Sequence, residues 1–275
     1  MIADAISQIM EAAEKNTQIR EGDFQDSEGL WVCGKCHTRK QTRIDGVFGM
    51  LEPFCMCQCE QEAYNAKEER RKRQDAFMRT RELRSAGIQD KALQVIRFEG
   101  SEMTDQLTRC LQYAKRWPEM KEKNIGLLLW GDTGNGKTYS AACIANYLIE
   151  RHVPCLMTSF PRILQSGFDS GALIRDLKHY DMVIIDDLGT ERQTEYGQEV
   201  VFAIVDELWK RGKPVIVTTN MALEEIKNPK DMTYKRIYKR ILDMCVPMKF
   251  SGEDRRDKNR REKLATLSEI MRAEA

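Results

Sequence analysis

Short apolar runs alternate with amphipathic stretches through the second part of the chain, from about Phe98 onward. The runs read as strands and lie at residues 125–130, 154–158, 181–185, 214–219 and 246–250. The stretches between them have helical character and lie at residues 137–151, 171–180, 195–211 and 232–244. Strands that alternate with helices predict an α/β fold, in which a mostly parallel, five-stranded sheet is covered by helices on both faces.

The pattern before Phe98 is different. Residues 2–13 place their apolar side chains on one stripe of a helix. Residues 60–84 are highly charged and contain no glycine or proline, which is typical of a solvated connecting helix. We therefore expect a small N-terminal domain over residues 1–60, a charged helical linker over residues 61–97 and the α/β domain over residues 98–275.

A glycine-rich segment, GDTGNGKT, follows the first apolar run and precedes an alanine-rich helix. Its glycines let the backbone curl with N–H groups pointing inward, and the helix that follows adds its positive dipole end. Lys137 is expected to reach the β- and γ-phosphates of ATP, and Thr138 to ligate Mg²⁺. The strand before and the helix after argue against a glycine turn that binds nothing. The predicted phosphate-binding loop (P-loop) consists of Gly131, Asp132, Thr133, Gly134, Asn135, Gly136, Lys137 and Thr138.

Two aspartates follow the apolar run that ends at residue 185. We expect Asp186 and Asp187 at the tip of the strand beside the P-loop, where Asp186 would hold Mg²⁺ and Asp187 would polarise the attacking water. Glu191 could share the second role. A purely structural role is disfavoured, because unpaired buried carboxylates are costly. Asn220, at the end of VIVTTN, could orient the water or sense the γ-phosphate, although asparagine after a strand is also a common turn residue.

Charge and composition limit the partners and the cellular location that we expect. Lys and Arg (44) nearly balance Asp and Glu (43), so any binding of DNA must come from local patches. Acidic residues flank the basic stretch at residues 70–73 and lie within the one at residues 255–263, which is typical of solvated helix faces. No run approaches the roughly 18 apolar residues of a membrane span, and the N-terminus lacks the features of a secretory signal. We expect a cytoplasmic protein with reduced thiols and no membrane partner.

Five of the nine cysteines crowd into residues 33–59. Two close pairs can converge into the four-ligand tetrahedral site that Zn²⁺ requires, and a segment this short needs a metal to fold. The spacing does not fit the two-Cys, two-His finger that reads DNA, so the site would be structural and belong to a protein-binding module. Cys55 or His37 could replace one ligand, and the alternative is a redox pair or unrelated buried thiols. The expected zinc ligands are Cys33, Cys36, Cys57 and Cys59.

Taken together, the motifs resemble those of AAA+ ATPases, and among these the DnaC/DnaI-type replicative helicase loaders of bacteria and phages and their IstB-like relatives. The resemblance covers roughly residues 98–256 and rests on LLLWGDTGNGKT, VIIDDLGTE, VIVTTN and RIYKRILDMCVPMKFSGEDRR. It implies that Arg240, or Arg236 one turn earlier, is an arginine finger that enters a neighbouring subunit's site. There a guanidinium neutralises charge that develops only in the transition state. It also implies that Arg256, or the adjacent Arg255, senses nucleotide in its own subunit.

The resemblance further implies an ATP-controlled loader. Its N-terminal module would bind a DnaB-type hexameric helicase, and its AAA+ domain would self-associate and bind single-stranded DNA. Many family members carry glutamate where Asp187 stands, so hydrolysis is expected to be slow. Two alternatives stay open, an IstB-like accessory ATPase for transposition that acts on duplex DNA, and an ATP-binding switch without significant hydrolysis. The zinc module and the connecting helix favour the loader.

Overall fold

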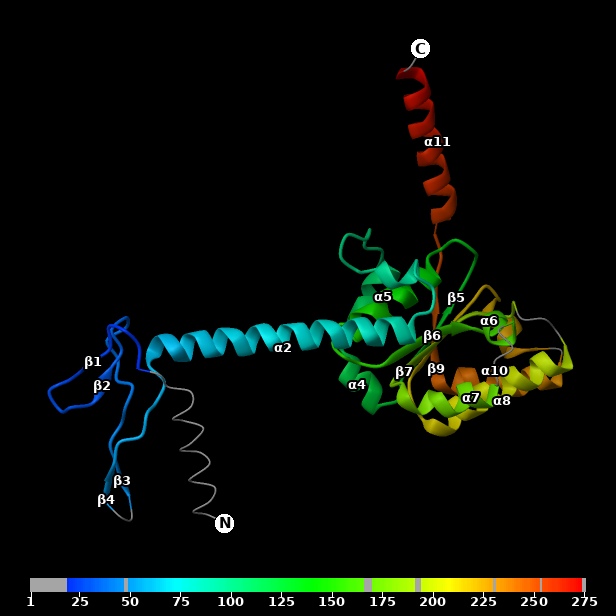
Figure 1. The fold of residues 1–275 in the computed structure, drawn as a ribbon. Helices are drawn as coiled ribbons and strands as arrows, with labels where there is room; N and C mark the ends of the chain where they lie inside the picture. Colours follow the sequence, from blue (N-terminus) through cyan, green and yellow to red (C-terminus); the bar gives the residue numbers. More distant parts are fainter. Residues whose placement is uncertain are drawn as a thin grey trace. The chain divides into compact units, whose positions relative to one another are not determined.

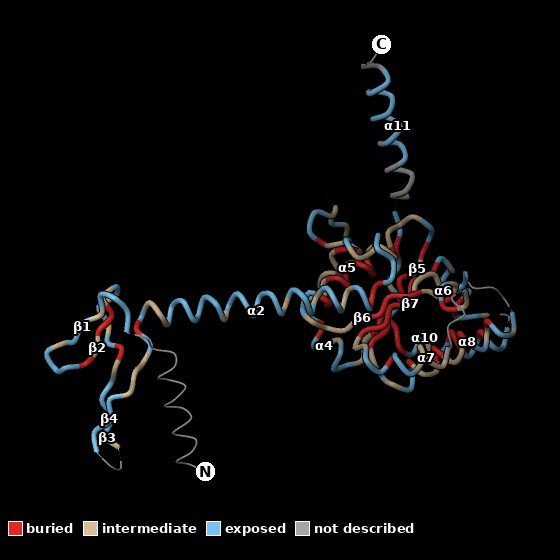
Figure 2. The backbone as a smooth tube through the Cα atoms, in the orientation of Figure 1, coloured by how far each residue is buried: buried red, intermediate tan, exposed pale blue. Residues whose placement is uncertain are grey.

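The computed structural model describes residues 19–46, 49–165, 170–190, 194–229, 231–252 and 254–273. The helix expected at residues 2–13 lies outside the described residues. The chain divides into two compact units, Met1–Phe77 and Met78–Ala275. The boundary falls inside one continuous helix, α2 (Gln58–Gly87), which confirms the charged helix predicted at residues 60–84 (Figure 1). Strong helix formers fill α2 and most of its residues are exposed (Figure 2).

Unit 1 contains two small antiparallel pairs of strands. One joins β1 (Phe24–Gln25) to β2 (Trp31–Val32), and the other joins β3 (Ile44–Gly46) to β4 (Gly49–Leu51). Few of the described side chains in this unit are buried, and the apolar ones among them are Leu30, Val32, Cys33 and Cys57. Strand pairs of this size need further support to be stable.

Unit 2 is built on a five-stranded, fully parallel sheet, which confirms the predicted fold class. The strand order is β6-β7-β8-β5-β9. The strands are nearly continuous apolar runs because both faces of the sheet are covered. Their bounds are β5 (Gly126–Trp130), β6 (Cys155–Ser159), β7 (Met182–Leu188), β8 (Val215–Thr219) and β9 (Cys245–Lys249).

Helices form a layer on each face of this sheet. Leu127 and Leu129 of β5 pack into one core, with buried residues of α3 (Asp105–Lys115), α4 (Trp117–Glu122) and α5 (Lys137–Ile149). Leu128 packs into the other core, with buried residues of α6 (Phe160–Gln165), α8 (Glu195–Arg211) and α10 (Met232–Met244). This alternation is the period of two that a strand imposes. Within the described residues, no helix is long and apolar enough to cross a lipid bilayer. Unit 2 also contains α7 (Ser170–Asp176), α9 (Leu223–Lys227) and α11 (Arg255–Ala273), with short 3₁₀ turns η1 (Leu93–Val95) and η2 (Leu177–His179).

One prediction about the sheet is wrong. The strand that ends in the two aspartates, β7, does not neighbour β5, the strand that leads into the P-loop, because β8 lies between them. The crossover from β5 through α5 leads to the outermost strand, β6, and β7 and β8 then fill the two intervening positions. The carboxyl ends of all these parallel strands still share one edge of the sheet, where ligands of such folds bind.

Candidate nucleotide site and cysteine cluster

The loop between β5 and α5 has the backbone of an anion cradle. Gly131, Gly134 and Gly136 have φ angles of 136°, 85° and 86°, a region that favours glycine. At Gly131 a Cβ atom would also overlap the carbonyl oxygen of Phe250, so this position has no room for a side chain. Helix α5 begins at Lys137, directly after the left-handed Gly136. The N–H groups in the first turn of a helix have no acceptor within the helix itself, so this turn can bind an anion held by the loop.

Lys137 lies within this loop and is only 5% exposed. Its ammonium group donates hydrogen bonds to the carbonyl oxygens of Gly131 (2.8 Å) and Asp132 (2.7 Å). A buried ammonium group needs such acceptors to offset its loss of hydration. Neutral carbonyls bind an ammonium less strongly than a phosphate does, so phosphate oxygens can replace them. The loop thus holds its cation ready for an anionic ligand.

The structure brings the two expected magnesium ligands together. The Thr138 hydroxyl donates a hydrogen bond to Asp186 Oδ1 at 2.8 Å. The two residues meet although β8 separates β7, which carries Asp186, from β5, which leads into the P-loop. Burial raises the pKa of Asp186, against the opposing effects of the Thr218 and Thr138 hydroxyls and the charge of Lys137. A divalent cation would stabilise this buried carboxylate, and hydroxyl and carboxylate oxygens are the hard ligands that Mg²⁺ prefers. The residues present therefore fit a magnesium ion.

Asp187 has an unusual backbone. Ile185 pairs with Val217 and Leu188 pairs with Thr219, so β7 has one more residue than β8 over this interval. This β-bulge places Asp187 in the left-handed region, at φ 56°. Such a conformation is uncommon for a residue with a side chain and is concentrated at functional sites.

Asn220 and Glu191 are the other two residues predicted to act on the catalytic water. Asn220 follows β8 directly and is exposed, and its side chain makes no hydrogen bond with the described residues. Its position still puts it at the edge of the sheet where β7 also ends. Glu191 lies outside the described residues. The roles of both remain predictions.

Arg240 on α10 is held by its own chain. Its Nη1 atom lies 2.6 Å from Asp206 Oδ1 on α8, and its guanidinium carbon lies 4.7 Å from the ring centroid of Phe202 and 5.3 Å from that of Trp209. Arg236 is exposed and makes no ion pair within the described part of the chain. Both arginines line an open cavity of about 360 Å³. The side chains of Arg255 and Arg256, at the start of α11, lie outside what the structure describes.

Four cysteines of unit 1 converge. The Sγ atoms of Cys33, Cys36, Cys57 and Cys59 all lie within 4.8 Å of one another, and the Cys33–Cys59 and Cys57–Cys59 separations are 3.7 and 3.3 Å. With Zn–S bonds of about 2.3 Å, tetrahedral ligand atoms lie about 3.8 Å apart, so this group fits Zn²⁺. Cys55 is not a member, and its thiol lies 3.7 Å from the Arg39 carbonyl oxygen.

The surroundings of the cluster favour thiolates on its first pair. The Thr38 hydroxyl and the Cys59 backbone N–H lower the pKa of Cys36 to about 5. Backbone N–H groups of Cys36 and Lys35 lower the pKa of Cys33. Burial has the opposite effect on Cys57, whose pKa it raises. A metal ion binds the thiolate form, so N–H and O–H donors of this kind are expected around a metal centre.

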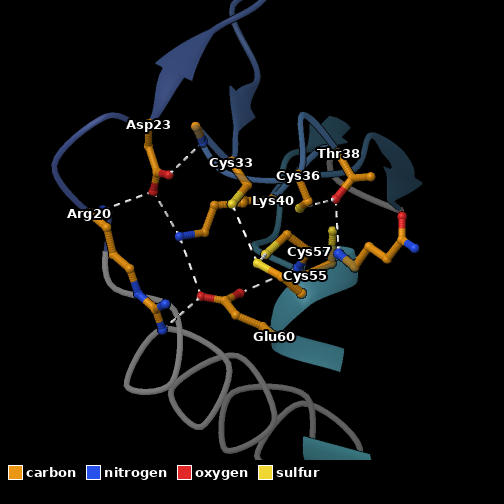
Figure 3. Close-up of polar contacts among 12 residues, drawn as sticks. Arg20, Asp23, Cys33, Cys36, Thr38, Lys40, Cys55, Cys57 and Glu60 are labelled. Atoms are coloured by element: carbon orange, nitrogen blue, oxygen red, sulfur yellow. Dashed lines mark hydrogen bonds and ion pairs between the residues drawn. The ribbon is translucent and has the colours of Figure 1, made fainter. Parts of the chain in front are cut away.

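A buried ammonium group lies beside the cysteines (Figure 3). Lys40 is fully buried, and its Nζ atom lies 2.8 Å from Asp23 Oδ2 and 3.5 Å from Glu60 Oε1. Glu60 also pairs with Arg20 at 3.2 Å and accepts a hydrogen bond from the backbone N–H of Cys57 at 3.3 Å. The backbone N–H of Arg20 and the ammonium of Lys40 lower the pKa of Asp23 to about 2. These bonds tie the cysteine cluster to the first turn of α2, and no sequence signal marks Lys40 as buried.

A sheet with this strand order, a P-loop and an acidic pair at one edge defines an AAA+ P-loop nucleotide-binding domain. The chain belongs to the family of IstB-like ATP binding proteins, whose sequence model matches residues 61–263, well over half of the chain.

Among curated proteins, the chain is similar to the replicative helicase loader DnaI of Bacillus subtilis (strain 168). The two are 27% identical over 150 residues, which are 49% of this chain and 48% of DnaI. It is also similar to the replicative helicase loader DnaC of Escherichia coli (strain K12). Here the identity is 28% over 125 residues, 42% of this chain and 51% of DnaC. The chain thus spans about half the length of these relatives.

Among solved structures, a crystal structure of DnaI has the same fold, with a TM-score of 0.51 and 22% sequence identity. The match covers 60% of this chain and 93% of the solved one. The predicted resemblance to AAA+ proteins of the helicase-loader group is therefore confirmed at the level of family and fold.

Proposed function

We propose that this protein is an ATPase that loads a DnaB-type replicative helicase onto single-stranded DNA during the initiation of replication. The observation that carries the proposal is the Thr138–Asp186 contact beside Lys137, in a chain whose curated relatives are named replicative helicase loaders. The contact supports a nucleotide site with its metal ligands already in place. The names of the relatives supply the process in which such a site would act.

In this proposal the P-loop backbone and Lys137 bind the phosphates of ATP. Thr138 and Asp186 hold Mg²⁺, which neutralises phosphate charge when it is bound. Asp187 accepts a proton from the attacking water, and Asn220 orients that water from the end of β8. Asp187 is one methylene shorter than glutamate and its backbone is fixed in the bulge, so we expect slow turnover that depends on partners.

A neighbouring copy of the chain completes the site with an arginine. Arg240 would have to leave Asp206 before it could reach a neighbour, whereas Arg236 already lies at the surface. Both belong to α10, so self-association through this face of unit 2 is part of the proposal. Arg256 would read the nucleotide bound to its own subunit.

Unit 1 serves as the module that binds the helicase. Cys33, Cys36, Cys57 and Cys59 hold a structural Zn²⁺, which fixes segments that bury little apolar surface of their own. The role of the metal is mechanical support, because all four positions of the tetrahedron are filled by the chain.

The test is capture of partners from a bacterial lysate by the full chain in ATP, followed by mass spectrometry, with the Lys137→Ala variant as control. Enrichment of a DnaB-type helicase that depends on Lys137 is the expected result. One competitor is an IstB-like accessory ATPase for transposition, since the family is described as IstB-like ATP binding proteins. The names of the curated relatives favour the loader. Capture of a transposase, together with ATPase stimulation by duplex and not by single-stranded DNA, would replace the loader with that function. ATP binding without phosphate release in any condition would indicate a switch.

A further inference from the structure

We infer that Thr218 is the positioning residue of the acidic pair, because its hydroxyl both holds the Asp186 carboxylate and fixes the backbone of Asp187. This inference rests on the proposed function, since it takes Asp186 as the magnesium ligand. Thr218 lies on β8, between the P-loop strand and the acidic strand, and it is fully buried. Nothing in the motif VIVTTN singles it out, apart from its being a polar side chain at the end of an apolar strand.

The hydroxyl of Thr218 uses both of its bonding modes on the acidic pair. It donates to Asp186 Oδ1 at 2.6 Å and accepts from the backbone N–H of Asp187 at 2.9 Å. A hydroxyl has one hydrogen to donate, so its donation is committed to Asp186. Because Oδ1 also accepts from Thr138, two hydroxyls fix that oxygen, and Oδ2 is the oxygen left for a cation.

The β-bulge explains why one residue can act on two. In a regular sheet a backbone N–H that points at the neighbouring strand bonds to a backbone carbonyl, whereas a bulge leaves its extra residue out of this ladder, so the N–H of Asp187 can bond to a side chain instead. The extra residue of β7 places both of them opposite Thr218. Asp187 then has a left-handed backbone, which must be held by its surroundings, and its N–H bond to Thr218 contributes to that hold.

The next residue provides a matched control. Thr219 is also fully buried on β8, but its hydroxyl donates to the Leu188 carbonyl oxygen at 2.8 Å and accepts from the backbone N–H of Met221 at 3.2 Å. Within the described residues, the Thr219 hydroxyl makes no hydrogen bond with either carboxylate. Thr219→Val therefore removes a buried hydroxyl from the same strand without touching the acidic pair.

The experiment compares the full chain with its Thr218→Val, Thr218→Ser and Thr219→Val variants. Binding of mant-labelled ATP is titrated in EDTA and at increasing Mg²⁺, and phosphate release is measured alongside. For Thr218→Val we expect the Mg²⁺ concentration at half-effect to rise about 10- to 100-fold, with kcat falling by a similar factor, as when an outer-shell partner of a metal ligand is lost. Affinity in EDTA, which depends on the P-loop, should stay at the wild-type value. Thr218→Ser keeps the hydroxyl and should restore most of the metal response, and Thr219→Val should retain it.

Three outcomes would each overturn this inference and leave the proposed function unaffected. These are a wild-type Mg²⁺ response in Thr218→Val, an equal loss in Thr219→Val, and a serine variant as impaired as the valine variant. Should Thr218→Val fail to fold, Thr218→Ala removes the same hydroxyl without placing a second methyl group against Asp186, and it is judged by the same criteria. A wild-type chain that binds no mant-ATP would instead refute the proposed function, and this inference with it.

Discussion

Loss of one cysteine ligand should unfold unit 1 while leaving the nucleotide site intact. Cys57 is 1% exposed and belongs to the four-thiol group, whereas Cys55 lies outside it. Burial of Leu30 and Val32 contributes about 3–6 kcal/mol to this unit, at about 1.5–3 kcal/mol for each side chain. Binding of a structural zinc ion contributes about 10–16 kcal/mol in small zinc domains. The metal term is the larger, so the unit should not stay folded without it.

The assay compares the full chain with Cys57→Ser and, as control, Cys55→Ser. Zinc content is measured with a colorimetric chelator after denaturation. Limited proteolysis reports whether residues 19–57 are folded, and mant-ATP binding reports whether the nucleotide site of unit 2 is intact. We expect about one zinc per chain in wild type and in Cys55→Ser, and a loss of both zinc and protease protection in Cys57→Ser. Affinity for mant-ATP should be equal in all three. Protease protection that survives removal of the metal, or zinc lost from Cys55→Ser but retained by Cys57→Ser, would refute this account.

Three further substitutions probe unit 2. Lys137→Ala should abolish ATP binding with the melting temperature unchanged, because it removes the only side-chain cation in the P-loop; unaltered nucleotide affinity would contradict the site. Arg240→Lys keeps a charge beside α8 but loses the planar guanidinium, so hydrolysis should fall about 10-fold or more at constant ATP affinity. Arg236→Lys is the matched control. If hydrolysis falls in Arg236→Lys and not in Arg240→Lys, Arg236 is the arginine finger. Gly131→Ala should lower the melting temperature, because the new Cβ would overlap the carbonyl oxygen of Phe250 at a positive φ; an unchanged melting curve would rule out this packing.

Much of unit 2 could be predicted from local pattern. Helices α8 and α10 begin and end where the sequence indicates, because Thr194 and Asp231 cap their N-termini and Gly212 ends α8 in a left-handed turn. Helix α3 was missed although Thr104 caps it and its buried residues follow a helical spacing. That signal is present in the sequence but weaker than those of the motifs.

Other features depend on contacts that no local pattern specifies. Spatial strand order follows from the crossover of α5, so the position of β8 between the P-loop strand and the acidic strand was not predictable from the runs alone. The choice among five cysteines needed the distances between thiols, which leave Cys55 out of the group. The β-bulge and the role of Thr218 were not predictable either, because the register between strands decides which residue faces the acidic pair.

The buried ammonium of Lys40 sets a limit on how unit 1 can be excised for study. Its carboxylate partners come from two other segments, Asp23 before the first strand pair and Glu60 at the start of α2. A fragment that starts after Asp23, or stops before Glu60, would lack one of the two carboxylates that pair with the buried Lys40 ammonium. Removing one partner of a buried ion pair costs about 3–5 kcal/mol. Isolated versions of this unit should therefore extend beyond both residues, even though the cysteines alone would suggest a shorter piece.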